Sequence, residues 1–104
     1  MQEITSAEEL ENVLDDNMQR AFLLLIKAPR CTVCEAVEQQ LTSFMNAYSS
    51  VIVNKISLEK VPSVSGKFLV FAAPTILIFK GGKEVWRGSR FISYDEMERV
   101  FRNM

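Results

Sequence analysis

A short, almost continuously apolar run, "AFLLLIKA" (21–28), constrains the fold of this chain more than any other segment. A run of this length that ends at a proline, here Pro29, is typical of a strand buried on both faces of a sheet. From Thr32 onward apolar residues recur with a period of about 3.6, which predicts a helix over about 31–47. The β-branched run "VIVNKISL" (51–58) predicts a second strand. Strand, helix and strand make a βαβ unit, so we expect a right-handed crossover and parallel strands.

The remaining segments predict further helices and a hairpin. A capping box, in which a serine is followed three residues later by glutamate, begins a helix at Ser6 and again at Ser93. Pro62 suits the first turn of a short helix that Gly66 weakens or ends. The glycines at 81–82 predict the turn of an antiparallel hairpin. The expected elements outside the βαβ unit are a helix over about 6–17, a short helix from 62, strands over 73–80 and 83–88, and a helix from 93 onward.

These elements fit an α/β fold in which a central mixed β-sheet is flanked by helices on both faces. We expect the parallel half of the sheet to be central, because its strands are the most apolar. A chain of 104 residues fits a single domain, 1–104, and is long enough to bury its own core. The sequence contains no linker, repeat or low-complexity segment.

Composition argues against several classes of function. The net charge is −1 and charges of both signs are interspersed, so we expect neither nucleic acid nor an anionic membrane as a partner. The longest apolar runs are too short to span a bilayer. The N-terminal "MQEITSAEEL" lacks the apolar region of an export signal. We therefore expect a cytoplasmic protein with reduced thiols, in which a structural disulfide is not expected.

The chain has no histidine, and its only two cysteines stand three residues apart in "RCTVC" (30–34). Without histidine, any chemistry depends on Cys, Asp, Glu, Lys, Tyr or the backbone. At the start of a helix the two cysteine Cα atoms are roughly 5–6 Å apart, within reach of a disulfide. Cys34 falls on the apolar stripe of the helix and is predicted to be buried. Cys31 lies at the N-terminal tip and is predicted to be more exposed.

This asymmetry predicts different roles for the two sulfurs. Free backbone N–H groups and the positive end of the helix dipole stabilise a thiolate at Cys31, with Arg30 adding to the effect and Glu35 opposing it. Cys31 would then attack a substrate disulfide, and Cys34 would resolve the mixed disulfide. Two other interpretations stay open on the residues alone. The cysteines could be small apolar residues of the core, or two copies of the chain could pool four thiolates around a metal, since one chain offers too few ligands.

Four segments together carry a family resemblance. They are "FLLLIKA" leading into "CTVC", the amphipathic helix that follows, "APT" before "ILIF", and the hairpin "GGKEVWRG" before a final helix. With the spacing from Cys34 to Pro74, they make nearly the whole chain resemble the thioredoxin family. The resemblance implies a cis Ala73–Pro74 bond against the cysteines, which leaves the Ala73 backbone free to pair with an extended substrate. On the residues alone, Pro74 merely begins a strand.

The sequence also departs from the pattern of that family. Arg30 stands where thioredoxins have Trp, and "TV" replaces Gly-Pro between the cysteines, so the resemblance does not fix the redox potential. Leu25 stands where thioredoxins hold a buried Asp that helps to deprotonate the second cysteine. We therefore expect Cys34 to be harder to deprotonate, and Lys55, which matches a lysine that partners the Asp, to lack that partner. These losses indicate a slower or more specialised exchanger.

A substrate-binding surface is predicted beside the cysteines. Phe71 with Ala72 is expected to form an apolar lip, whereas Phe68 and Val70 are expected in the core. The single tryptophan, Trp86, is interpreted as a packing or surface residue on the hairpin. The predicted catalytic residues are Cys31 and Cys34, and the predicted substrate-binding residues are Arg30, Thr32, Phe71, Ala73 and Pro74.

The predicted function is thiol–disulfide exchange between Cys31–Cys34 and disulfides of protein or small-thiol substrates. The protein is expected to be a monomer that needs no organic cofactor and no metal, and a reductase or low-molecular-weight thiol would recharge it. The alternative is a thioredoxin-fold binding module, an adaptor whose thiols no longer turn over.

Overall fold

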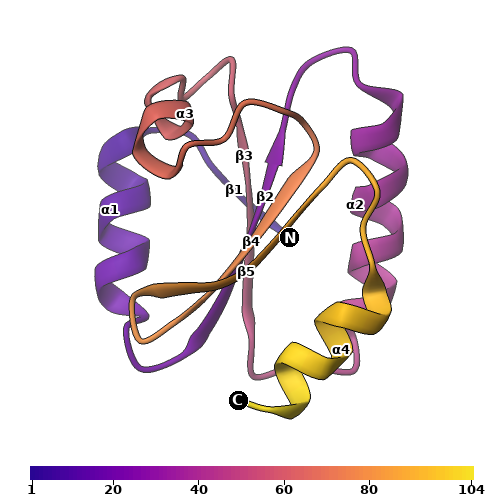
Figure 1. Ribbon diagram of the computed structural model, residues 1–104. Coiled ribbons are helices and arrows are strands. Elements are labelled where there is room, and N and C mark those ends of the chain that lie inside the picture. Colours follow the sequence, from indigo (N-terminus) through magenta and orange to yellow (C-terminus); the bar gives the residue numbers. More distant parts are fainter.

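The apolar run of the sequence forms the middle strand of a five-stranded sheet. In the computed structural model, which describes residues 1–104, residues 22–26 of strand β2 (Ala21–Lys27) are at most 1% exposed. The strand order is β1-β3-β2-β4-β5, with helices on both faces (Figure 1). The other elements are β1 (Gln2–Ile4), α1 (Ala7–Asp16), α2 (Thr32–Met45), β3 (Ile52–Ser57), α3 (Ser63–Phe68), β4 (Thr75–Lys80), β5 (Lys83–Ser89) and α4 (Tyr94–Arg102).

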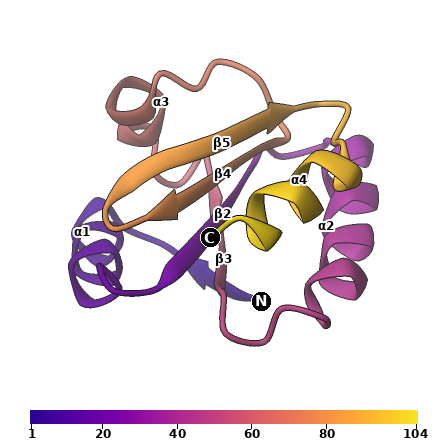
Figure 2. The same cartoon turned by 60° about the horizontal axis from the view of Figure 1, so that its bottom comes forward.

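Two apolar cores lie on opposite faces of the sheet, and β2 contributes to both. Successive side chains of a strand point to opposite faces. Phe22, Leu24 and Ile26 pack with residues of α1 and α3, whereas Leu23 and Leu25 pack with residues of α2 and α4. Figures 1 and 2 show these two pairs of helices on opposite sides of the sheet. The double burial is the reason why the run is apolar at every position and not at alternate ones.

The strand pairing agrees with the predicted mixed sheet. β2 and β3 are parallel, with Leu25 beside Lys55, and β2 and β4 are antiparallel. The antiparallel strand β4 is as interior as the parallel pair, and residues 75–79 of it are buried. Gly81 and Gly82 have φ angles of 62° and 78°, a left-handed turn that favours glycine and closes the β4–β5 hairpin as predicted.

Strand β1 is an element that the sequence analysis did not place. Gln2, Glu3 and Ile4 pair in parallel with β3, and this puts part of the parallel half at the edge of the sheet. Only Ile4 is buried. A segment of three residues with one apolar side chain has no measurable periodicity, so its pairing depends on contacts with distant residues.

The predicted helix starts are confirmed at both capping boxes. The Oγ atoms of Ser6 and Ser93 accept hydrogen bonds from the N–H groups three residues later, at 3.0 and 3.2 Å. Helix α3 begins after Pro62 as expected, but it continues through Gly66. It ends at Leu69, whose φ of 55° is left-handed. None of the helices combines the length and apolar character that crossing a bilayer requires.

Aromatic and apolar residues outside the βαβ unit lie largely as predicted. Val70 is 1% exposed and Phe68 packs against the core on the α1 and α3 face. Trp86 packs against the opposite core and its Nε1 donates to Glu96 at 3.1 Å, which confirms a packing role. Phe71, by contrast, is 79% exposed.

The seating of α2 on the sheet depends on Leu41, which is fully buried in the core beneath that helix. We expect Leu41→Ala to lower the free energy of unfolding by about 2–5 kcal/mol, because it leaves a cavity there. Urea unfolding followed by circular dichroism measures this loss. Ser43→Ala, at an exposed position of the same helix, should change the free energy of unfolding by less than about 0.5 kcal/mol. Equal effects of the two substitutions would contradict the packing described above.

Candidate active site

The two cysteines lie where the chain passes from β2 into α2. Arg30 has a left-handed φ of 53°, and Cys31 is the N-cap residue of α2. The Sγ atom of Cys31 accepts a hydrogen bond from the N–H of Cys34 at 3.1 Å. Serine, threonine or aspartate side chains usually fill this role at a helix start. The first sulfur therefore lies among the free N–H groups at the positive end of the helix dipole.

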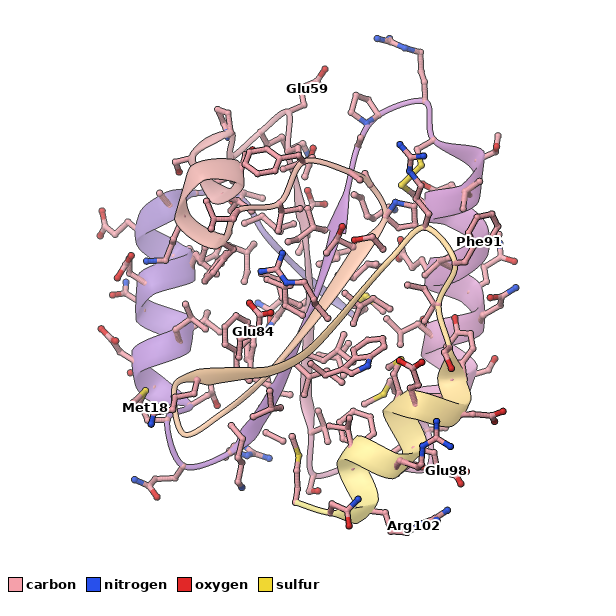
Figure 3. All side chains as sticks on the ribbon, in the orientation of Figure 1. Met18, Glu59, Glu84, Phe91, Glu98 and Arg102 are labelled. Atoms are coloured by element: carbon pink, nitrogen blue, oxygen red, sulfur yellow. A yellow bond between two sulfur atoms is a disulfide. The ribbon has the colours of Figure 1, made fainter.

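The two sulfurs are joined in a disulfide at the start of α2, visible as a yellow bond in Figure 3. Their Cα atoms are 5.2 Å apart, as the spacing predicts. Cys34 is fully buried and Cys31 is partly exposed, which confirms the predicted asymmetry of burial. A structural disulfide was not expected from the sequence. This bond closes so short a loop that it restricts little of the unfolded chain, and it therefore contributes little to stability.

A cavity of about 410 Å³ opens beside Cys31. Five of the predicted site residues line it, from the β2–α2 junction and from the loop before β4: Arg30, Cys31, Thr32, Ala73 and Pro74. Cys34 lies behind Cys31 and does not line the cavity. Phe71 is also outside the lining, so the structure does not bring this predicted lip residue to the cavity.

The cavity has further walls that the sequence analysis did not assign to the site. They are Val33, which is 51% exposed, and Arg90 and Phe91 in the loop between β5 and α4. Figure 3 labels Phe91, which is 94% exposed and lies on the α2 side of the molecule. Arg90 and Phe91 are far from the cysteines in sequence and belong to no periodic pattern. Only the pairing of β5 with β4 brings their loop beside Pro74.

The loop before β4 presents a free stretch of backbone to the cavity. The Ala73–Pro74 peptide bond is cis, as the resemblance implies. The C=O groups on either side of Ala73 are bound: that of Ala72 accepts from Thr75 Oγ1 at 2.7 Å, and that of Pro74 from the Arg90 N–H at 2.7 Å. The N–H and C=O of Ala73 form no hydrogen bond with the rest of the chain. They are therefore available to another polypeptide.

A charge network joins α2 to strands β2 and β3 of the sheet. Leu25 is fully buried among apolar residues, and it brings no carboxylate to β2. Lys55, for which the sequence analysis found no partner, donates to Glu38 Oε2 at 2.8 Å. Lys27 also donates to Glu38, and it pairs with Glu35 at 3.0 Å. The carboxylate that partners Lys55 thus comes from helix α2.

Glu38 lies one helical turn after Cys34 and is held as a carboxylate. Burial alone would raise the pKa of Glu38, but hydrogen bonds from Lys27 and Lys55 outweigh it and hold that pKa below its ordinary value. Burial likewise opposes the charge of Lys27, yet hydrogen bonds to Glu38 and Glu35 raise the pKa of Lys27. A carboxylate bound in this way is a weak proton acceptor.

Comparison with known proteins identifies the class. The thioredoxin family model matches residues 2–101, and the chain belongs to this family. It is 30% identical to the thioredoxin-like protein YdfQ of Bacillus subtilis over 105 residues, covering all of this chain and 94% of that protein. It is 28% identical to thioredoxin-2 of Saccharomyces cerevisiae, covering 82% of this chain and 81% of that protein.

Solved structures confirm the thioredoxin fold. The thioredoxin of Fasciola hepatica superposes with a TM-score of 0.85 at 22% identity, covering 99% of this chain and 98% of that one. The thioredoxin NaTrxh of Nicotiana alata gives a TM-score of 0.86 at 25% identity, covering 98% of this chain and 90% of that one. The Cys31–Cys34 disulfide pair is consistent with thiol–disulfide exchange, the chemistry that the family pattern implies.

The charge network generates a prediction about stability and pH. Glu38→Gln leaves Lys55 without a carboxylate partner and Lys27 with Glu35 alone, so we expect the free energy of unfolding at pH 7 to fall by about 1–3 kcal/mol. Because the pKa of Glu38 is lowered by folding, its contribution is complete above the ordinary value of 4.5 and is lost as the pH falls through the folded value. The difference between wild type and variant should therefore shrink in acid.

Urea unfolding at several pH values between 7 and 3 measures this difference. Glu98→Gln is the matched control, because Glu98 pairs with Arg102 on an exposed helix surface. Exposed pairs contribute about 0–1 kcal/mol. A Glu38→Gln variant as stable as wild type at pH 7, or one whose deficit grows in acid, would show that the network does not hold α2 to the sheet.

Proposed function

We propose that this protein is a thiol–disulfide oxidoreductase in which Cys31 attacks and Cys34 resolves. The observation that carries this proposal is the arrangement of the two sulfurs at the start of α2. Cys31 is partly exposed on a cavity and accepts a backbone hydrogen bond, while Cys34 is buried directly behind it. A substrate sulfur can reach the first cysteine only, and the second is within bonding distance of the first.

The exchange proceeds in two displacements. The Cys31 thiolate attacks one sulfur of a substrate disulfide, forms a mixed disulfide and releases the other substrate sulfur as a thiolate. Cys34 then loses its proton and attacks Cys31 Sγ, which forms the Cys31–Cys34 disulfide and releases the second substrate thiol. The substrate gains two electrons that the enzyme loses, the proton from Cys34 goes to the second substrate sulfur, and the first leaves as the thiolate that replaces the Cys31 thiolate.

The walls of the cavity position the substrate. The free N–H and C=O of Ala73 pair with an extended segment of the substrate, in the manner of an added strand. Pro74, Thr32 and Arg30 line the same cavity as Cys31 and contact the substrate there. Phe71, two residues before Ala73, contacts the substrate farther along the segment, outside the cavity.

Recharging the enzyme requires only a donor of two electrons. The two sulfurs store these electrons themselves, so the reaction needs no organic cofactor and no metal. A reductase or a low-molecular-weight thiol supplies the electrons by reducing the Cys31–Cys34 disulfide. We infer that the protein works as a monomer in the cytoplasm, where such donors maintain reduced thiols.

Turnover tests the proposal directly. The wild-type protein should accelerate the reduction of insulin disulfides by dithiothreitol, and Cys31→Ser should abolish the acceleration because it removes the attacking sulfur. Cys34→Ser should retain the first displacement and accumulate a mixed disulfide on Cys31, which non-reducing electrophoresis and mass spectrometry detect. The adducts trapped from a cell extract would name the substrates.

The adaptor alternative makes the opposite prediction. Exposed apolar residues beside the cysteines would then bind partners without thiol chemistry, so partner binding would survive Cys31→Ser and no mixed disulfide would accumulate in Cys34→Ser. The third interpretation, a metal shared between two copies, predicts dimers of the reduced protein that a chelator dissociates. Either outcome would overturn the proposed oxidoreductase.

A further inference from the structure

The backbone at two cavity residues is unusual for the residues that stand there. Three residues other than glycine have left-handed φ angles: Arg30 at 53°, Leu69 at 55° and Arg90 at 62°. Leu69 ends helix α3, a common place for this conformation. The other two are both arginines, and both line the cavity beside Cys31. Glycine adopts this backbone without the penalty that a Cβ atom brings, so these side chains are present at a cost in stability.

The two guanidinium groups lack a counter-charge within the chain. Arg30 and Arg90 are exposed, and neither takes part in any of the ion pairs of the structure. The lining of the cavity contains no aspartate or glutamate. The chain as a whole carries a charge of −1, so this local positive charge is not a property of the whole surface. It is complementary to a negatively charged ligand.

The two arginines approach the cavity from different loops. Arg30 immediately precedes Cys31, whereas the Arg90 N–H binds the C=O of Pro74 at 2.7 Å and so stands beside the free backbone of Ala73. Phe91, the neighbour of Arg90, adds an apolar surface that is 94% exposed. Because Arg30, Arg90 and Phe91 line the same cavity as Ala73, an extended polypeptide paired with Ala73 would lie close to two arginines and an aromatic residue. Guanidinium binds carboxylates through paired hydrogen bonds.

We propose that the cavity selects disulfides of extended protein segments in which acidic residues flank the reacting cysteine. Arg30 and Arg90 are the specificity-determining residues, and each binds a substrate carboxylate. This inference rests on the proposed oxidoreductase function and names the substrate class of the same site. A protein segment is favoured over a small anionic disulfide because only a polypeptide uses the free N–H and C=O of Ala73 together with both arginines.

The test compares peptides that differ only in charge. Each peptide contains the same pair of cysteines joined in a disulfide, flanked by glutamate, glutamine or lysine, and dithiothreitol recycles the enzyme. We expect kcat/KM to be about tenfold higher for the glutamate peptide than for the lysine peptide at low salt. About 1 M salt should reduce this ratio to near one, because it screens exposed charges. The ratio cancels any effect of Arg30 on the reactivity of Cys31, which is common to all peptides.

Variants assign the preference to the two arginines. In Arg30→Gly/Arg90→Gly, glycine suits the left-handed backbone, and the ratio of glutamate to lysine peptide should fall to within about twofold. Arg30→Lys/Arg90→Lys keeps the charge and should retain most of the ratio. The matched control is Arg20→Gln/Arg99→Gln. It removes two exposed arginines that do not line the cavity and do not take part in an ion pair. This control should leave the ratio unchanged. Circular dichroism verifies that each variant is folded. The salt dependence of the wild-type protein tests the charge selection even if a variant fails to fold.

The outcomes separate this inference from the proposed function. Equal kcat/KM for all peptides, or a preference that survives the glycine pair, would overturn the charge selection while leaving the oxidoreductase intact. Faster turnover of oxidised glutathione than of the glutamate peptide would overturn the choice of a polypeptide. Absence of turnover with every disulfide would contradict the proposed function itself.

Discussion

The hydrogen bond from the Cys34 N–H to Cys31 Sγ is the contact on which the proposed chemistry of this protein depends. It makes the first sulfur part of the cap of α2, where unpaired N–H groups and the helix dipole favour a negative charge. The contact exists because α2 is seated on the sheet by its apolar stripe, and the sheet is held by the doubly buried strand β2. Packing in the core therefore fixes the position of Cys31 Sγ at the surface.

Charge around the cysteines is distributed in a way that distinguishes this chain from the family pattern. Leu25 keeps β2 apolar where the family pattern has a carboxylate, and the carboxylate that binds Lys55 belongs to Glu38 on α2. Two lysines bind that carboxylate, so it offers little help in removing a proton from Cys34.

At the cavity beside Cys31, Arg30 and Arg90 add positive charge that no acidic side chain of the chain compensates. The helix start thus favours an anionic Cys31, and the two arginines match the acidic substrate segment proposed above, whereas no free carboxylate assists the deprotonation of Cys34.

Local sequence patterns predicted most of the fold and the centre of the site. The buried run at 21–28, the amphipathic stripe of α2 and the capping boxes each produce their element through neighbours close in sequence. The same holds for Cys31 and Cys34, whose spacing on a helix sets their distance. Strand β1, Phe91 and Arg90 escaped prediction because tertiary pairing alone brings them to the sheet edge or the cavity. The role of Glu38 was hidden for the same reason, since a surface glutamate on a helix has many possible partners.

The relative alkylation rates of the two thiols show directly whether the start of α2 makes Cys31 anionic and accessible while it keeps Cys34 buried. The reduced protein is treated with iodoacetamide at pH 7 for short times, and mass spectrometry of the digested protein gives the rate at each cysteine. A thiolate reacts and a buried thiol does not. We expect Cys31 to be alkylated at least about tenfold faster than Cys34, and faster than a cysteine in an unfolded peptide. Equal rates at the two positions, or a Cys31 no more reactive than the peptide cysteine, would contradict this expectation.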